Sequence, residues 1–184
     1  MSREDEYQIV ETCRRLSSIG MMPASDGNVS LRLDEKTVII TPTGIRKEQL
    51  KPQDLVHIQP EDDDVSDRAS SEWRMHAEIY RKFPDVNAVV HAHPVHLTAW
   101  GLRDELPDIS LLYETAETIG NIIMIPAEEP GSAEYAKLVA DALADASVGI
   151  MKRHGAVAVG ESIEEALFRL ERAEHLAHVE SLTR

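Results

Sequence analysis

Two histidines at the end of an apolar run are the residues best suited to chemistry in this sequence. His91 and His93 close the run 88–93, and Pro94 follows them. Side chains alternate between the two faces of a β-strand, so residues two apart point the same way. Neutral imidazoles are the commonest metal ligands in proteins, so the pair can share one ion. The same spacing fits two unrelated, half-buried histidines, and other residues must decide between these interpretations.

Two further residues would complete a metal site. His154 lies beside Gly155 at a junction between predicted strands, where a residue without a β-carbon lets backbones approach closely. Three histidines would leave one tetrahedral position open, which is typical of a catalytic zinc. Glu72 falls in the predicted first turn of a helix, where the helix dipole favours an ionised carboxylate. It would bind the metal or move a proton beside it.

Turns made of small residues form a second group with chemical potential. They are Ser25-Asp26-Gly27-Asn28, Thr43-Gly44 and Ser70-Ser71. Their hydroxyl and amide groups can hold a phosphate without a net positive charge nearby. Taken singly, each turn is more often ordinary turn chemistry, so the phosphate interpretation depends on the three occurring together.

The elements that must position these residues alternate between helices and strands. Apolar periodicity predicts helices over 3–19, 71–83, 96–100 and 133–145, and a last helix that starts at Ser162. It predicts strands over 29–33, 37–41, 55–58, 88–93, 122–125, 148–151 and 156–159. We expect 29–33 to be half-buried, 122–125 to be buried, and 103–121 to be an irregular crossover. Without repeats or linkers, the chain is expected to form a single α/β domain over 1–184.

Composition excludes several classes of function. The 184 residues carry a formal charge of −14, which argues against nucleic acid and anionic membranes as partners. Cys13 is the only cysteine, so an intrachain disulfide and a thiolate metal cluster are excluded. The first residues are charged and lack the apolar core of an export signal. No run reaches the roughly 20 apolar residues of a membrane span, so we expect a cytoplasmic protein.

Six segments, in order along the chain, resemble the class II aldolase/adducin family. The resemblance extends from the first predicted helix to the last, and within the family it is strongest to the aldolases of the L-fuculose 1-phosphate type. The segments are SDGNVSLR (25–32), ITPTG (40–44), SSEWRMH (70–76), DVNAVVHAHPVHLTA (85–99), PGSAEYA (130–136) and MKRHGAVAVG (151–160).

The resemblance implies a fold and a metal site. It implies a three-layer α/β/α domain around a mainly antiparallel sheet, and a C4 homotetramer with active sites at subunit interfaces. His91, His93 and His154 match the zinc ligands, and Glu72 matches the carboxylate that serves as ligand and as catalytic acid/base. Tyr113 matches a tyrosine that reaches in from a neighbouring subunit and handles the proton on the C4 hydroxyl. The positions that match the phosphate site are Gly27, Asn28, Thr43, Gly44, Ser70 and Ser71.

The implied reaction is that of a metal-dependent aldehyde-lyase in carbohydrate metabolism. A 2-keto-sugar 1-phosphate would bind through its C2 and C3 oxygens to zinc, and the C3–C4 bond would break to release an aldehyde. The electrons would collect as an enediolate stabilised by the cation. Glu72 would then protonate the carbon to give dihydroxyacetone phosphate.

Other members of the family remain as alternatives. The pentulose-phosphate 4-epimerases carry Asp where this chain has Glu72, which favours an aldolase. Methylthioribulose-1-phosphate dehydratases and aldolases share the fold and the histidines, so the sequence leaves them open. Adducin-like members without activity have lost the histidines that this chain keeps. Manganese or cobalt would also suit the ligands. The other histidines are expected to be packed or surface residues: His57, His76, His96, His175 and His178.

Overall fold

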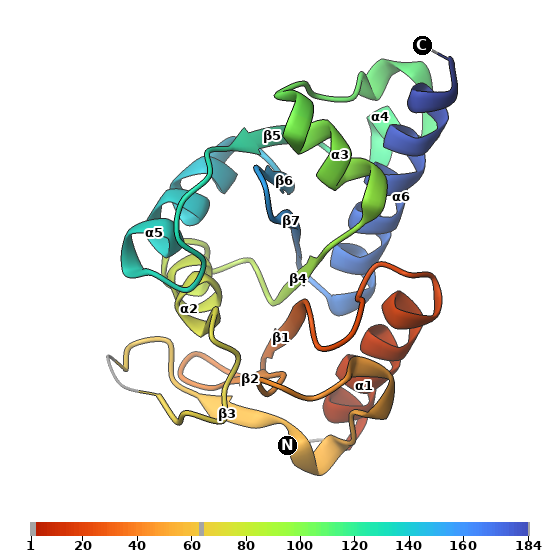
Figure 1. The fold of residues 1–184 in the computed structure, drawn as a ribbon. Helices are drawn as coiled ribbons and strands as arrows, with labels where there is room; N and C mark the ends of the chain where they lie inside the picture. Colours follow the sequence, from red (N-terminus) through yellow and green to blue (C-terminus); the bar gives the residue numbers. More distant parts are fainter. Residues whose placement is uncertain (1–2, 63–64, 184) are drawn as a thin grey trace.

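The computed structural model describes residues 3–62 and 65–183, and within these ranges a seven-stranded sheet lies between two layers of helices (Figure 1). The strand order is β3-β2-β1-β4-β7-β6-β5, and every neighbouring pair is antiparallel except β5 with β6. The predicted three-layer α/β/α fold with a mainly antiparallel sheet is therefore confirmed. The strands are β1 (Asn28–Arg32), β2 (Val38–Ile40), β3 (Val56–Ile58), β4 (Ala88–Ala92), β5 (Ile122–Ile125), β6 (Val148–Met151) and β7 (Gly155–Gly160).

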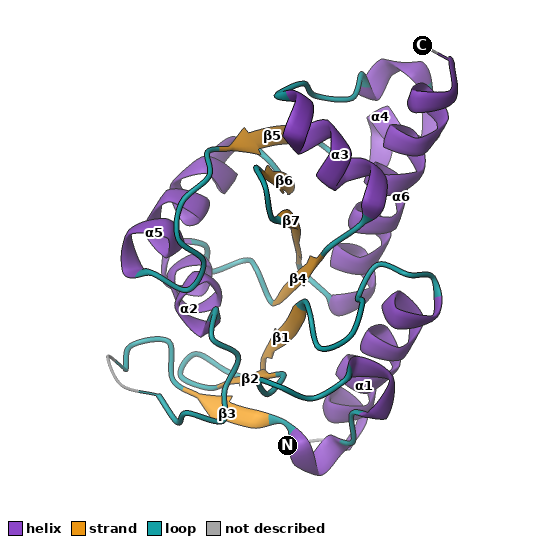
Figure 2. Cartoon of the chain, viewed as in Figure 1, coloured by secondary structure: helices purple, strands orange, loops and turns teal. Residues whose placement is uncertain are grey.

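Helices cover both faces of the sheet. α2 and α5 pack together on one side, whereas α1, α3 and α6 lie on the other (Figures 1 and 2). Short 3-10 helices connect several of these elements. The α-helices are α1 (Arg3–Ser18), α2 (Trp73–Lys82), α3 (Val95–Arg103), α4 (Tyr113–Thr118), α5 (Ala133–Ala142) and α6 (Ile163–Thr183); the 3-10 helices are η1 (Lys47–Gln49), η2 (Pro52–Asp54), η3 (Ile109–Leu111) and η4 (Leu143–Asp145).

The central strands supply alternate residues to two separate cores. In β4, Val90 packs with the α1/α3/α6 core, whereas Val89 packs with the α2/α5 core. In β1, Val29 and Leu31 belong to the first core. The period of two in a strand therefore turns the polar residues of β1, such as Ser30, toward α2. The apolar run of β4 is continuous because both faces of this strand are buried.

Two expectations about strand burial were wrong. β1 was expected to be half-buried, but it lies between β2 and β4 with helices on both faces, and Ser30 is fully buried. β5 was expected to be buried, but it is the edge strand next to β6, and Ile122, Ile123 and Met124 are only partly covered. Both errors follow from strand order, which the local pattern of a strand does not contain.

The predicted crossover over 103–121 is more regular than expected. It contains η3 and the short helix α4, which begins at Tyr113 and packs beside α6. Asp108 caps η3 by accepting a hydrogen bond from the backbone N–H of Ser110 at 2.9 Å. The segment lacks a strong apolar period, so its helix forms through packing on α6 rather than through a local signal.

Sequence signals for helix starts are confirmed at the last two long helices. Ser132 accepts a hydrogen bond from the N–H of Tyr135 at the start of α5, at 3.1 Å. Ser162 accepts one from the N–H of Glu165 at 3.2 Å, and the Glu165 carboxylate accepts from the N–H of Glu161. These contacts satisfy backbone donors that a helix start leaves without partners.

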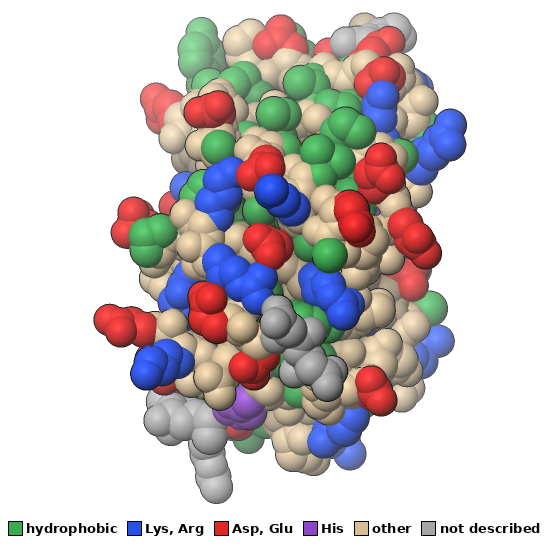
Figure 3. All heavy atoms as spheres, turned by 90° about the vertical axis from the view of Figure 1, so that its left-hand side faces the viewer, with side chains coloured by type: hydrophobic (Ala, Val, Ile, Leu, Met, Phe, Trp, Pro, Cys, Tyr) green, Lys and Arg blue, Asp and Glu red, His purple; other side chains and the backbone are tan. Residues whose placement is uncertain are grey.

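The surface over α2 and α5 mixes both signs of charge. Acidic and basic side chains lie next to one another on this face (Figure 3). The strongly negative net charge is therefore not gathered there. Among the described residues, no helix is both long enough and apolar enough to cross a bilayer.

Candidate metal centre

The end of β4 positions two of the predicted ligands. His91 is fully buried and pairs across the sheet with Asn28 of β1 and Val157 of β7. His93 was expected inside the strand but follows its last residue, because its N–H donates to the carbonyl of Met21 in a loop instead of continuing the ladder. The two rings nevertheless converge, with centroids 5.1 Å apart.

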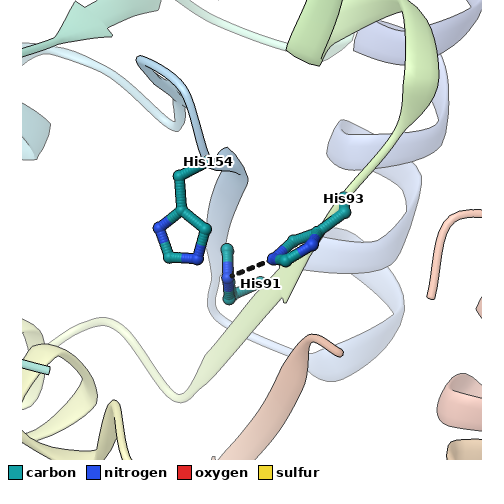
Figure 4. Close-up of side chains that lie close together, drawn as sticks. All are labelled: His91, His93 and His154. Atoms are coloured by element: carbon teal, nitrogen blue, oxygen red, sulfur yellow. Dashed lines mark hydrogen bonds between the residues drawn. The ribbon is translucent and has the colours of Figure 1, made fainter. Parts of the chain in front are cut away.

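The turn between β6 and β7 brings the third histidine to the same point. Arg153 takes a left-handed conformation (φ 60°), and the N–H of His154 donates to the carbonyl of Met151. A β-carbon on Gly155 would collide with the carbonyl of Ala92, so glycine permits this close approach of β7 to β4. The ring of His154 then lies 4.7 Å from that of His91 (Figure 4).

The three imidazoles present their nitrogens to a common centre. One ligand atom from each of His91, His93 and His154 lies within 4.8 Å of the others, and no other group in the described part of the chain meets this condition. Nδ1 of His91 donates to the carbonyl of Ala156 at 2.9 Å, which leaves its Nε2 facing the centre. Nδ1 of His93 lies 3.3 Å from the carboxylate of Asp26, so its Nε2 also faces inward.

Glu72 lies against this centre. It is the N-cap residue of α2, not part of the first turn as expected, because the helix begins at Trp73 rather than at residue 71, and it is 7% exposed. Its Oε2 accepts a hydrogen bond from Nδ2 of Asn28 at 2.8 Å and lies 3.1 Å from Nε2 of His91. Its Oε1 is buried without a hydrogen-bond partner and lies 3.7 Å from Nε2 of His154. One carboxylate oxygen is therefore held between Asn28 and His91, and the other faces His154.

The electrostatics of the centre favour neutral imidazoles at His93 and His154 beside an ionised carboxylate. Burial opposes ionisation of Glu72, yet His91, His154 and the Asn28 amide hold its pKa well below the usual range. Burial likewise opposes protonation of His91, but the Glu72 carboxylate raises the pKa of that imidazole. Burial and the proximity of His91 lower the pKa of His154 to about 4 and also lower the pKa of His93. His93 and His154 are thus neutral at pH 7, the form that binds metals.

These residues fit a divalent cation. The two Nε2 atoms of His91 and His93 lie 3.3 Å apart, although their outer nitrogens already face Ala156 and Asp26. A buried carboxylate oxygen without a partner is costly, and Oε1 of Glu72 is such an atom. A cation that accepts imidazole nitrogen and carboxylate oxygen would satisfy all of these atoms at once. Imidazole with carboxylate suits zinc and other divalent ions of the first transition row.

A cavity of about 300 Å³ opens above the centre. Glu72, His93 and His154 line one part of it, and the three small-residue turns line most of the remainder, together with Pro42, Lys47 and Pro130. Gly27 has φ +73°, and a β-carbon there would lie 2.8 Å from the carbonyl of His91, so only glycine fits. All six residues predicted for phosphate binding line this cavity: Gly27, Asn28, Thr43, Gly44, Ser70 and Ser71.

Three residues near the cavity were not singled out from the sequence. Lys47 is 1% exposed, and its ammonium donates to the carbonyls of Ser25 at 2.7 Å and Ile45 at 3.2 Å. The hydroxyl of Tyr135 is buried without a partner, and its ring lies 6.5 Å from that of His154. Asp26 was noted only as part of a turn, and the structure brings it to His93. No local spacing signals these roles, because each depends on how loops pack.

Tyr113 is the one predicted site residue that the structure brings neither to the metal centre nor to the cavity. It lies at the start of α4, is 92% exposed and is not among the residues that line the cavity. Its predicted role therefore depends on another subunit.

Comparison with known proteins identifies the family. The model of the "Class II Aldolase and Adducin N-terminal domain" matches residues 7–181. L-fuculose phosphate aldolase of Escherichia coli (strain K12) is 36% identical over 175 residues, which cover 94% of this chain and 80% of that protein. Methylthioribulose-1-phosphate dehydratase of Acidiphilium cryptum (strain JF-5) is 31% identical over 185 residues, covering 94% and 88%.

Solved structures agree with this result. The L-fuculose-1-phosphate aldolase from Thermus thermophilus superposes with a TM-score of 0.88 at 28% sequence identity, covering 100% of this chain and 96% of that one. The predicted family is therefore confirmed, and with it the class of enzyme, a class II aldehyde-lyase. The fold, the converging histidines and the relatives together show that this chain belongs to the class II aldolase and adducin family.

Proposed function

We propose that the protein is a zinc-dependent aldolase that reversibly cleaves a 2-keto-sugar 1-phosphate of the L-fuculose 1-phosphate type. The products would be dihydroxyacetone phosphate and an aldehyde. One observation carries the proposal: a single cavity combines turns suited to phosphate with His93, His154 and Glu72, and buried His91 lies directly beside these two histidines. Relatives at 35% and 36% identity bear the name L-fuculose phosphate aldolase.

The phosphate of the substrate would bind at the three turns. Gly27, Thr43, Gly44, Ser70 and Ser71 line this part of the cavity and supply backbone N–H groups and three hydroxyls. Such groups hold phosphate well through directed hydrogen bonds. Anchoring there would fix the reacting carbon relative to Glu72, and orientation of this kind contributes roughly 7–11 kcal/mol in favourable cases.

His91, His93, His154 and Glu72 would hold one zinc ion per chain. When bound, the ion would act as a Lewis acid that stabilises negative charge on the substrate oxygens. Oε1 of Glu72 would carry the proton: it takes one from the carbon beside the carbonyl in the synthetic direction and returns it during cleavage. Asn28 holds the other oxygen of Glu72 and so orients this transfer.

Tyr113 of a neighbouring subunit in a homotetramer would transfer a second proton, the one on the C4 hydroxyl. Its 92% exposure in the single chain leaves it available for an interface. Native mass should then correspond to four chains. Tyr113→Phe should slow cleavage by about 10²-fold or more, as expected when a general acid/base is lost. It should leave proton exchange on dihydroxyacetone phosphate intact, because that step uses Glu72.

A product assay tests the reaction class directly. The assay offers fuculose-, rhamnulose-, ribulose- and methylthioribulose-1-phosphates to the zinc-loaded protein. Aldehyde plus dihydroxyacetone phosphate supports an aldolase. Loss of water would favour the dehydratase alternative, which the 31% identical relative keeps open, and an isomeric pentulose phosphate would indicate an epimerase.

Glu72→Gln tests the proton carrier. The variant keeps the shape of the side chain but cannot accept a proton. It should fold normally and lose exchange of the carbon-bound proton of dihydroxyacetone phosphate with D₂O, measured by NMR. Exchange at the wild-type rate would remove Glu72 from this role.

A further inference from the structure

A continuous chain of buried hydrogen bonds extends from the metal centre into the core. It joins Glu72 to Asn28 (2.8 Å), Asn28 to His76 (2.5 Å), His76 to Ser30 (2.6 Å) and Ser30 to Tyr80 (2.7 Å). All five side chains are at most 7% exposed. We call these five residues the β1–α2 chain. Three of them, His76, Ser30 and Tyr80, have no part in the proposed reaction.

The β1–α2 chain arises from a match between two periods. Asn28 and Ser30 are two residues apart on β1, which advances about 6.6 Å over that step. Glu72, His76 and Tyr80 follow one another at intervals of four, and a helix advances about 6 Å over four residues. Residues of the strand and of the α2 segment therefore interleave at nearly equal spacing. The side chains of each element fall into the gaps of the other.

The chemistry of the groups decides the direction of the first two bonds. The ionised carboxylate of Glu72 can only accept, so the NH₂ group of Asn28 must face it. The amide oxygen of Asn28 then faces Nε2 of His76, which must carry a proton to donate. His76 is fully buried, and this burial lowers its pKa to about 3, so the ring is neutral and its Nδ1 has no proton.

The remaining bonds follow in the same sense. Nδ1 of His76 can only accept, so the hydroxyl of Ser30 donates to it. The oxygen of Ser30 then accepts from the hydroxyl of Tyr80. The carbonyl of Asn87 lies at 3.4 Å from the Tyr80 hydroxyl and competes weakly for its proton. Every donor thus points toward Glu72, from Tyr80 through Ser30, His76 and Asn28.

We propose that His76, Ser30 and Tyr80 are positioning residues that act through Asn28 on the proton-carrying carboxylate of Glu72. The inference rests on the proposed function. Their hydrogen bonds fix the amide of Asn28 with its NH₂ group toward Oε2, so that Oε1 stays turned to His154. Without the proton on Nε2 of His76, the amide can rotate by half a turn and place its oxygen against the carboxylate. That repulsion would displace Glu72 from the reacting carbon.

Two substitutions of His76 separate this role from a general need for a packed core. His76→Leu fills similar space but cannot donate to Asn28. The amide of Gln reaches about as far as Nε2 of histidine, so His76→Gln can still donate. With the zinc-loaded protein, His76→Leu should slow proton exchange on dihydroxyacetone phosphate at least about tenfold, with little change in KM. His76→Gln should recover most of the exchange rate.

Substitutions farther along the β1–α2 chain should have graded effects. Ser30→Ala should slow exchange about three- to tenfold, because Nδ1 of His76 loses its donor and the ring can change tautomer. Tyr80→Phe should have about a twofold effect. Trp100→Phe is the control: it removes a buried hydrogen bond of 3.1 Å to the carbonyl of Ala177, on the other side of the sheet. It should destabilise the protein and leave the exchange rate unchanged.

A spectroscopic measurement tests the arrangement without activity. Nitrogen NMR of the zinc-loaded protein should show His76 neutral at pH 7, with the proton on Nε2. A proton on Nδ1, or a charged ring, would overturn the inference even if His76→Leu failed to fold. Equal exchange rates in wild type, His76→Leu and His76→Gln would overturn it too. If the wild-type protein itself showed no exchange, the proposed function would fail instead. This result distinguishes failure of the proposed function from failure of the positioning inference.

Discussion

Two histidine clusters both draw on the segment 91–96 but differ in geometry. In the metal centre, the rings of His91, His93 and His154 meet edge-on, at interplanar angles of 62° to 71°. In the second cluster, His96 of α3 and His178 of α6 stack, with centroids 3.9 Å apart and an interplanar angle of 14°. The lone pairs of imidazole lie in the ring plane. Edge-on rings can therefore aim at one point, whereas stacked rings cannot converge in this way.

The carboxylates beside the two clusters differ in whether their oxygens have hydrogen-bond partners. Glu174 accepts hydrogen bonds from Nδ1 and the backbone N–H of His96 and from the backbone N–H of Leu97, at 2.7, 3.0 and 2.9 Å. It therefore caps the start of α3 and anchors this helix to α6. Glu72, by contrast, keeps one buried oxygen without a partner. The comparison teaches that residue type alone does not indicate function here; an unsatisfied atom at a point of convergence does.

The largest expected effect separates the two clusters by metal content. His154→Ala should reduce bound zinc well below one ion per chain and slow cleavage by about 10³-fold or more, because the Lewis acid is lost. His178→Ala, the matched change in the stacked cluster, should retain full zinc content and activity. Elemental analysis of the purified variants and an aldehyde-release assay check both. Full zinc content in His154→Ala would contradict the proposed ligand set.

A smaller effect should distinguish the two carboxylates by stability. Glu174→Ala removes the cap of α3 and leaves backbone donors of His96 and Leu97 without partners. It should lower the free energy of unfolding by about 1–3 kcal/mol and leave zinc content unchanged. Denaturant unfolding measures this loss, with Glu72→Gln as the counterpart that loses proton exchange while keeping its stability. An unaltered unfolding midpoint in Glu174→Ala would show that its contacts with α3 contribute nothing.

The metal centre was largely predictable because its residues stand at the ends of recognisable elements. His91 and His93 show the period of a strand, and Gly155 marks the close approach beside His154. The strands predicted over 29–33, 37–41, 148–151 and 156–159 are present as β1, β2, β6 and β7, and they form the antiparallel pairs β1/β2 and β6/β7. These features depend on local sequence, where apolar periodicity and turn chemistry act directly.

Features that depend on packing between distant segments were not predictable in the same way. The interval of four from Glu72 through His76 to Tyr80 is visible in the sequence, but its partner on β1 is known only once strand order places β1 beside β4 and against α2. His76 was therefore interpreted as an ordinary packed residue. The same reason explains the errors over β1 and β5, whose burial depends on their place in the sheet.

The smallest expected effect is on the pH dependence of stability. It contrasts buried His76, which titrates, with buried Trp100, which does not. Burial lowers the pKa of His76 from its ordinary value of 6.5 to about 3. Below pH 6.5 the unfolded chain binds a proton at this imidazole and the folded chain does not. The unfolded state is then favoured, so stability is lost as the pH falls from about 6.5 toward 3. The contribution is at most about 1.4 kcal/mol per pH unit.

His76→Gln removes this titration, so it should lose about 1 kcal/mol less stability than wild type between pH 6 and pH 5. Trp100→Phe, which breaks a buried hydrogen bond without removing a titrating group, should keep the wild-type slope. Chemical unfolding at several pH values measures the slopes. Identical slopes in wild type and His76→Gln would mean that His76 takes up its proton in the folded protein as readily as in the unfolded chain. The hydrogen bonds of the β1–α2 chain would then not all point toward Glu72, because a charged ring donates from both nitrogens.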